Sequence, residues 1–235
     1  MKYIVSDPHS TYSKFLSSMP RDAKHVIING DLFNKGWEQE QMLFWLMDNY
    51  NKPKYTFIFG NHDVRFFNEL NQMLKADKYM DYKDDLYNAW YQANNTYNIA
   101  NIAFKLIKEK RIDPDVLFKK VLKSFNWYHI VKGRQFTYII SHTSWEFNRS
   151  PKNQDKRNLV YDTIGFFNKV RKKVDSKMDK IANKYKKNNL RHVFGHYVCN
   201  KVFKQDAPYI NRDVFYFTDN GVFKKQNDYF FLPIE

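Results

Sequence analysis

Short apolar runs that end on a glycine or a polar residue constrain this chain more than any other feature. In the clearest run, residues 26–28 are all β-branched, and Asn29, Gly30 and Asp31 follow directly. A β-branched run closed by glycine is typical of a buried strand, and open α/β sheets place their reactive groups just beyond the carboxyl ends of such strands. The sequence therefore predicts that Asp31 lies at a functional edge of a sheet.

Four other runs end in the same way. Residues 3–6, 55–59, 136–141 and 191–194 each lead into polar side chains, which are Asp7 and His9, then Asn61, His62 and Asp63, then His142, then His196. Together with Asp31, the five strand ends offer three aspartates, one asparagine and four histidines. Mixed oxygen and imidazole donors suit Mn, Fe or Zn better than Ca. We therefore expect a transition-metal site along one edge of one sheet.

Helical periodicity fills the gaps between the early runs. Tyr12, Phe15, Leu16 and Met19 are spaced at i, i+3, i+4 and i+7, and residues 43–50 repeat that pattern. Strand–helix–strand units form right-handed crossovers between parallel strands. The first sheet is therefore expected to begin as a parallel sheet.

The chain of 235 residues is predicted to form a single domain, residues 1–235, with a helical cap inserted at about 64–135. Asp113 and Pro114 are expected to open a helix in the cap, since Asp is a favoured N-cap and Pro suits the first helical position. In the tail, residues 201–204, 214–217 and 229–232 are predicted to be antiparallel strands of a second sheet.

Apolar residues at steps of three and four from Phe167 to Tyr185 predict a long amphipathic helix, placed at about 159–190. Its other face is rich in lysine. Two interpretations stay open, a solvated face and a surface that contacts nucleic acid.

The formal net charge of +14 favours acidic partners such as nucleic acids, nucleotides or phosphoproteins. AT-rich codon usage is an alternative explanation, because the chain is also rich in Asn, Tyr and Phe. Cys199 is the one cysteine and has no internal disulfide partner. No stretch approaches a membrane span, so no membrane partner is expected and a cytoplasmic location is predicted.

The order Asp7-Pro8-His9, Gly30-Asp31, Gly60-Asn61-His62-Asp63, His142 and Gly195-His196 resembles the calcineurin-like metallophosphoesterases of bacterial or phage type. Gly195-His196-Tyr197-Val198 has no second histidine, which places the resemblance on the serine/threonine-phosphatase-like branch. The resemblance implies an α/β fold of two stacked mixed sheets flanked by helices.

The resemblance also implies two divalent metal ions, with Mn as the first choice and Fe, Zn or Ni as alternatives. Asp31 would bridge the ions. The implied ligands are Asp7, His9 and Asp31 for the first metal, and Asp31, Asn61, His142 and His196 for the second.

His62 is the implied general acid for the leaving oxygen, since a histidine pKa suits that task. Asn34 stands where the family often has a carboxylate that orients this histidine, and it can accept a hydrogen bond from the ring without adding charge. Asp63 is expected to form hydrogen bonds that position the metal ligands, without binding the metals itself.

Lys35 occupies the position of a phosphate-binding arginine in the family, so it keeps the charge but not the bidentate geometry. Arg149 and Arg157 are candidates to supply that geometry instead.

The predicted function is hydrolysis of phosphate monoesters, with a metal-activated water as the nucleophile. Dinucleoside polyphosphates, nucleic-acid ends and cyclic phosphates are alternative substrates. A nucleic-acid-binding protein that retains the metals without turnover is the alternative from another class.

Overall fold

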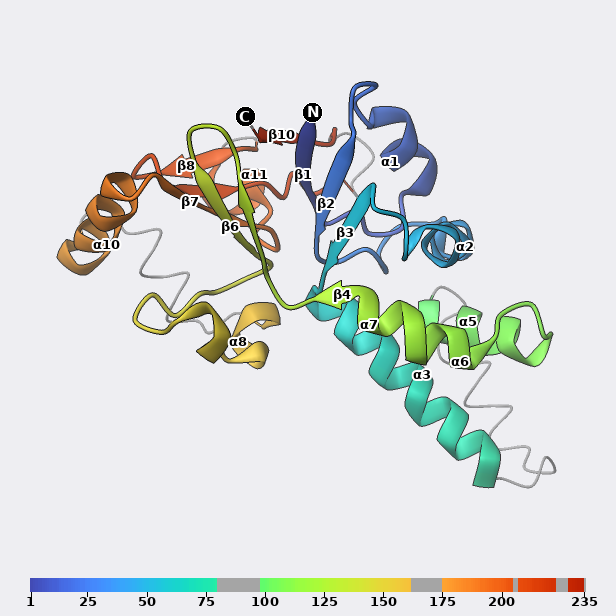
Figure 1. Cartoon of the computed structure of the whole chain (residues 1–235). Coiled ribbons are helices and arrows are strands. Elements are labelled where there is room, and N and C mark those ends of the chain that lie inside the picture. The colour runs from blue at the N-terminus through green and yellow to red at the C-terminus, as the bar shows by residue number, and fades with distance from the viewer. Residues whose placement is uncertain (80–97, 162–174, 205–206, 223–227, 235) are drawn as a thin grey trace.

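The computed structural model describes residues 1–79, 98–161, 175–204, 207–222 and 228–234 (Figure 1). Two five-stranded sheets form the centre of the molecule, and helices lie on their outer sides. This arrangement confirms the predicted pair of stacked mixed sheets.

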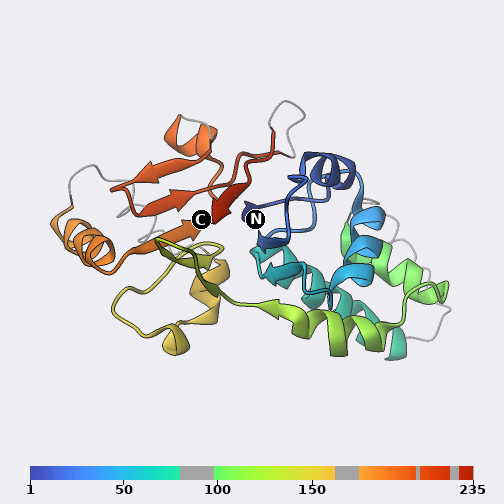
Figure 2. The same cartoon turned by 45° about the horizontal axis from the view of Figure 1, so that its top comes forward.

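The first sheet is largely parallel, as predicted from the strand–helix–strand units. Its strands, in spatial order, are β10 (Leu232–Ile234), β1 (Lys2–Ser6), β2 (His25–Asn29), β3 (Tyr55–Ile58) and β4 (Phe125–Asn126). Only β10 is antiparallel to its neighbour, and it brings the C-terminal strand beside the N-terminal one (Figure 2). The helices between the first strands are α1 (Tyr12–Ser18) and α2 (Gln39–Asn49).

The second sheet has a parallel centre and antiparallel margins. Its strands, in spatial order, are β5 (His129–Lys132), β6 (Thr137–Ser141), β7 (Leu190–Phe194), β9 (Phe215–Phe217) and β8 (Tyr209–Asn211). Strands β6, β7 and β9 run parallel, so β6 and β7 direct their carboxyl ends to the same edge.

Alternation along the strands builds two apolar layers. Ile27 on β2 joins Ile140 and Val193 of the second sheet in the layer between the sheets. The next residue, Ile28, belongs instead to the cluster that contains the outer helices. Successive side chains of a strand point to opposite faces, so one strand supplies both layers.

The helices predicted as a cap pack on the outer side of the first sheet. They are α3 (Asn61–Tyr79), α5 (Ile99–Lys108), α6 (Pro114–Val116), a π-helical turn (Leu117–Val121) and α7 (Leu122–Ser124). Phe66 on α3 and Phe104 on α5 share one core with Phe57 of β3. The predicted limit at residue 135 is too late, because the chain re-enters the sheets at Phe125. Asp113 caps α6 as predicted, accepting a hydrogen bond from the Asp115 N–H.

The described part of the predicted basic helix is α10 (Ser176–Lys187). This helix has its own N-cap, Asp175, whose carboxylate accepts hydrogen bonds from the Lys177 and Met178 N–H groups. Before it come a 3₁₀ turn (Pro151–Asn153) and α8 (Lys156–Val160), and residues 162–174 lie outside the described residues. The prediction of one helix over 159–190 is therefore too long.

The prediction of a strand at 201–204 is wrong, because these residues belong to α11 (Cys199–Phe203) and its C-cap. A four-residue segment with two adjacent apolar residues also fits one helical turn, so its pattern alone does not separate a strand from a helix. The tail strands also divide between the sheets: β9 is parallel to β7, and β10 joins the first sheet. Among the described residues, no helix has both the length and the apolar character needed to cross a membrane.

Candidate metal centre

The polar side chains that follow β1, β2, β3, β6 and β7 come together at one end of the two sheets. Hydrogen bonds join the loops that carry them: within the first sheet the His9 N–H donates to the Asp31 carbonyl at 2.9 Å, and between the sheets the His196 N–H donates to the Asp7 carboxylate at 3.0 Å. The loops of both sheets therefore form one polar cluster.

Asp31 belongs to two groups of possible metal ligands within the described ranges. One group is His9, Asp31 and His62, and the other is Asp31, His142 and His196. In each group the ligand atoms lie within 4.8 Å of one another. The Asp31 Oδ2 atom is 3.8 Å from His9 Nε2, and Oδ1 is 3.4 Å from His142 Nε2. The two carboxylate oxygens thus face different halves of the cluster.

The remaining predicted ligands lie beside the second group. Asn61 Oδ1 is 3.1 Å from His142 Nε2. Asp7 Oδ1 is 4.0 Å from His142 Nδ1, and both oxygens of Asp7 accept the His196 N–H, at 3.2 and 3.0 Å. Asp7 therefore contacts the second-sheet side of the cluster through His142 and His196, whereas the resemblance assigns it to the first metal with His9.

The backbone turns sharply to present these side chains. Asp7, His9, Asp31 and His196 all have left-handed φ values, between 46° and 61°. Such a conformation costs about 1–3 kcal/mol for a non-glycine residue and is found preferentially at functional sites. Gly30 also has a positive φ of 79°, and a Cβ there would overlap the His142 ring. These turns explain why the strand ends carry glycine.

Two histidines are held by backbone carbonyls at Nδ1, so that their Nε2 atoms face the other polar groups of the cluster. The Nδ1–H of His9 donates to the Phe33 carbonyl at 3.2 Å, and that of His142 donates to the Asn29 carbonyl at 3.3 Å. Such hydrogen bonds fix the tautomer of a metal-binding imidazole. Burial lowers the pKa of His9 to about 3, so its ring is neutral at neutral pH. The pKa of His142 is also lowered by burial, but the Asp31 carboxylate outweighs this and raises it overall.

Buried carboxylates crowd the same space. Burial raises the pKa of Asp63 to about 7 and that of Asp219 to about 6, and the Asp31 charge adds to both shifts. Burial together with the charges of Asp219 and Asp31 holds the pKa of Asp7 well above its usual range. Asp31 itself has a strongly lowered pKa, because the neighbouring histidines outweigh its burial. Buried charges are normally paired or coordinate metals, so divalent cations fit this donor set.

His62 lies at the rim of the cluster. Its Nε2 is 4.0 Å from Asp31 Oδ2, and its side chain is 20% exposed. The Asn34 amide donates to His62 Nδ1 at 3.3 Å, so Asn34 is a donor to the ring rather than the acceptor expected from the sequence. A neutral ring that accepts at Nδ1 carries its proton on Nε2, the nitrogen that faces the cluster. Burial lowers the pKa of His62, and the Asp31 charge partly offsets this.

The Asp63 carboxylate connects the loop after β2 to the loop after β3. Its Oδ1 accepts the Leu32 N–H and its Oδ2 accepts the Gly60 N–H, both at 2.9 Å. The Asp63 side chain is fully buried. It therefore holds the loops after β2 and β3 in place.

The three predicted phosphate-binding residues differ in position. The Lys35 Nζ atom donates to His9 Nε2 at 3.0 Å, which places this cation at the cluster. Arg149 forms an ion pair with Glu146 at 2.9 Å, and Arg157 is exposed near the start of α8. Lys35 is therefore the one of these three that contacts a predicted metal ligand among the described residues.

Asp219 is not among the site residues predicted from the sequence. Its side chain is 1% exposed, and it accepts the Gly221 N–H at 2.7 Å. Asp219 also raises the pKa of Asp7, so the two carboxylates are electrostatic neighbours. It follows the apolar residues of β9 closely, and this strand-end signal could have identified it.

The calcineurin-like phosphoesterase family model matches residues 3–208. A search of curated protein sequences gave no significant match. A solved structure described as a candidate diadenosine tetraphosphatase is similar at 14% identity, covering 100% of this chain and 93% of that one, with a TM-score of 0.56. A serine/threonine phosphatase from Saccharomyces cerevisiae (12% identity, 92% of this chain and 65% of that one) has a TM-score of 0.47. A metallophosphoesterase from Sphaerobacter thermophilus is similar at 12% identity, covering 92% of this chain and 75% of that one, with a TM-score of 0.44.

The family match spans most of the chain, including Asp7, Asp31, His142 and His196. The first of the solved structures shares the fold over the whole length of the chain. The protein therefore belongs to the calcineurin-like phosphoesterase family and is a metallophosphoesterase.

Proposed function

We propose that this enzyme hydrolyses phosphate monoesters at a dinuclear metal centre. The observation that carries the proposal is that Asp31 belongs to both ligand groups. Its two carboxylate oxygens face His9 on one side and His142 on the other. A carboxylate placed in this way can give one oxygen to each of two ions.

The residues proposed to hold the first ion are Asp7, His9 and Asp31, and those for the second are Asp31, Asn61, His142 and His196. When bound, two divalent cations lower the pKa of a shared water and neutralise charge on the phosphoryl oxygens. Carboxylate, amide and imidazole donors suit Mn, Fe, Zn or Ni, and Mn is our first choice.

His62 is proposed to donate a proton from Nε2 to the leaving oxygen. The proton-donating form of the ring is the imidazolium, which carries a proton on both nitrogens, so Asn34 would turn its amide oxygen toward the Nδ1–H in that form. The partly exposed ring lies between the cluster and solvent, where a leaving group would depart. Asn34 orients the ring without adding charge.

Lys35 is proposed to bind a phosphoryl oxygen. Its ammonium already reaches the cluster, 3.0 Å from His9 Nε2. A monoester dianion carries one more negative charge than a diester, so a cation at this position favours the monoester. Phosphoserine, phosphothreonine and nucleotides all present this group.

Paired substrates test the proposal. With Mn added, the protein is expected to release nitrophenol from p-nitrophenyl phosphate faster than from bis(p-nitrophenyl) phosphate. Faster cleavage of the diester would instead support the alternative diester substrates, such as cyclic phosphates. Asp48→Asn is a matched control for changes at Asp31, because Asp48 is an exposed aspartate on α2.

Tight metal binding without turnover on either substrate, with Mn, Fe, Zn or Ni, would overturn the proposal. It would favour the alternative of a metal-retaining nucleic-acid-binding protein.

A further inference from the structure

Trp37 is an exposed aromatic residue on the loop that carries Asp31 and Lys35. It is 66% exposed, more than any other large hydrophobic side chain among the described residues. Tryptophan is usually well buried on average, and its ring is the largest apolar surface that a side chain can offer. Single exposed apolar residues are common, so the significance of Trp37 depends on its position and support.

The backbone on both sides of Trp37 is fixed against the loop after β1. Gly36 packs so closely there that a Cβ would overlap the His9 carbonyl oxygen. On the other side, the Glu38 N–H donates to the Ser10 carbonyl at 3.0 Å. Trp37 is therefore displayed from a rigid segment, which lowers the entropy cost of binding a ligand against its ring.

Buried Gln39 reinforces the same segment. Its Oε1 accepts the Asn34 N–H at 3.1 Å and the Ser10 hydroxyl at 2.8 Å, and its Nε2 donates to the Gly36 carbonyl at 3.1 Å. The positions of Asn34 and Gly36 are thus set by one side chain. The loop therefore holds Trp37 in a defined relation to the metal centre.

Lys35 connects Trp37 to the position proposed for the phosphate. Lys35 and Trp37 are both exposed and flank buried Gly36. Residues two apart in a chain have Cα atoms at most about 7 Å apart. The Lys35 ammonium reaches His9 Nε2, so the exposed Trp37 follows by two residues the lysine that contacts the metal centre.

We infer that Trp37 stacks on the base of a nucleotide whose phosphate is hydrolysed at the centre. This inference rests on the proposed function and narrows its substrate class. A ribose separates base from phosphate in a nucleotide, which suits the short spacing from Lys35 to Trp37. The formal net charge of +14 also favours phosphate-rich ligands. Base–aromatic stacking is strong enough to change affinity by about 5- to 100-fold.

AMP and ribose 5-phosphate form the test pair, because they share the sugar and the phosphate monoester and differ by the base. Wild-type enzyme with Mn is expected to prefer AMP by about 5- to 100-fold in kcat/KM. Trp37→Ala should reduce this ratio to within about threefold of one, and Trp37→Phe should keep most of it. Ile210→Ala removes an exposed apolar side chain on β8 and should leave the ratio unchanged.

Equal use of AMP and ribose 5-phosphate by the wild type would refute stacking and leave the proposed function standing. If neither compound is hydrolysed, calorimetric binding of both to the Mn-loaded protein measures the same ratio independently of turnover. A ratio near one there would also refute stacking. An oligonucleotide with a 5′-phosphate tests whether the base belongs to a nucleic-acid end or to a free nucleotide. A higher kcat/KM for the oligonucleotide than for AMP indicates a nucleic-acid end, and a lower one indicates a free nucleotide.

Discussion

The two halves of the metal centre each contain one buried and one partly exposed histidine, but they differ in the polar groups around those rings. On the second-sheet side, His142 is fully buried and its ring is held by the Asn29 carbonyl. On the first-sheet side, the His62 side chain is 20% exposed and meets the Asn34 amide, and exposed Lys35 reaches His9. From this difference we propose that the second-sheet half binds metal only, and that the first-sheet half also contacts the substrate through Asn34, Lys35 and His62.

The largest effect is expected at Asp31, the residue common to both halves. Asp31→Asn keeps the shape but removes the charge that both groups share. Metal affinity should fall by more than about 100-fold at both positions, beyond the 10- to 100-fold typical of residues that only orient ligands. Equilibrium dialysis with Mn measures this, and hydrolysis of p-nitrophenyl phosphate should be lost in parallel. Asp48→Asn should match the wild type, and weakening of one ion alone in Asp31→Asn would contradict a shared carboxylate.

The next largest effect is expected for substitution of His62, which tests whether the first-sheet half takes part in proton transfer. His62→Ala should retain the metals but lose about 10²- to 10⁴-fold in kcat on an alkyl phosphate, because the leaving oxygen lacks its proton donor. The loss should be smaller on p-nitrophenyl phosphate, since nitrophenol needs little protonation. Steady-state kinetics on both substrates separate these outcomes. An equal loss on the two substrates would remove His62 from the role of proton donor, and a loss of metal would assign it to ligation.

Lys35 is expected to act on substrate affinity. Lys35→Ala removes a charge-assisted hydrogen bond, which corresponds to about 10- to 100-fold in kcat/KM for a monoester dianion. Lys35→Arg should restore most of this, because the charge returns. As a control, the same two variants are assayed on bis(p-nitrophenyl) phosphate. The loss of kcat/KM in Lys35→Ala should be smaller on this diester. A deficit of the same size on the diester would remove Lys35 from recognition of the extra charge.

The smallest effect is expected on α10, which is far from both halves in the fold. Met178, Ala182 and Tyr185 pack with Phe194 and Phe215 behind the second sheet.

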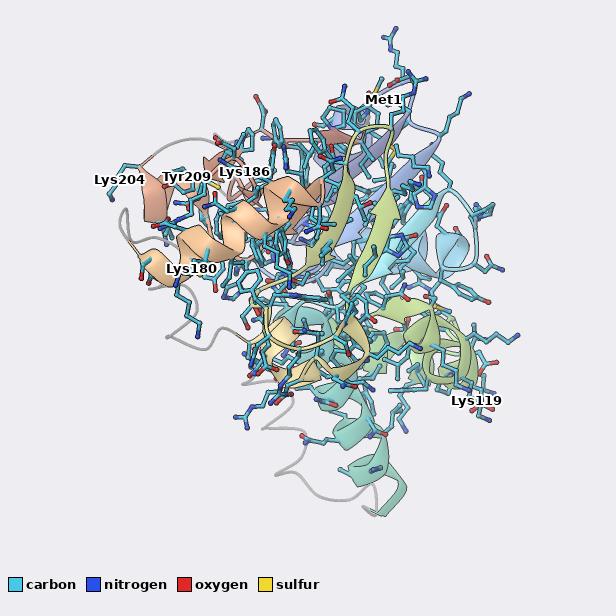
Figure 3. All side chains as sticks on the ribbon, turned by 60° about the vertical axis from the view of Figure 1, so that its left-hand side comes forward. Met1, Lys119, Lys180, Lys186, Lys204 and Tyr209 are labelled. Atoms are coloured by element: carbon cyan, nitrogen blue, oxygen red, sulfur yellow. The ribbon has the colours of Figure 1, made fainter. Side chains whose placement is uncertain are left out.

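The lysines on the other face of α10 are exposed, and Figure 3 labels two of them, Lys180 and Lys186. Replacing Lys177, Lys180, Lys184 and Lys187 with Gln should leave hydrolysis of p-nitrophenyl phosphate within about twofold, because screening removes long-range effects of exposed charges. If this face binds nucleic acid, the same variant should show weaker binding and a shallower salt dependence than the wild type. Binding that is insensitive to salt and to the four substitutions would exclude that surface.

The strand ends were predictable because one physical rule covers all of them. Parallel strands direct their carboxyl ends to the same side, so residues as distant in sequence as Asp7 and His196 were expected together. The alternation that separates Ile27 from Ile28 likewise followed from the period of a strand.

Other features depend on contacts that the sequence does not display. Residues 201–204 contain an apolar pair that was interpreted as a strand, yet they lie in α11 and its C-cap, where Cys199 is buried and the Cys199 N–H donates to the Asp219 carbonyl. The donor role of Asn34 depends on which amide atom faces His62, and the burial of Asp219 depends on where β9 is placed in the sheet. Each is a tertiary effect that local propensity cannot specify.

Counting the bound metal ions tests the central claim most directly. Calorimetric titration of the metal-depleted protein with Mn, checked by elemental analysis, is expected to give two ions per wild-type chain. His9→Ala and His142→Ala should each weaken mainly one of the two, on opposite sides of Asp31. One ion or none in fully active wild-type protein would contradict a dinuclear centre that shares Asp31.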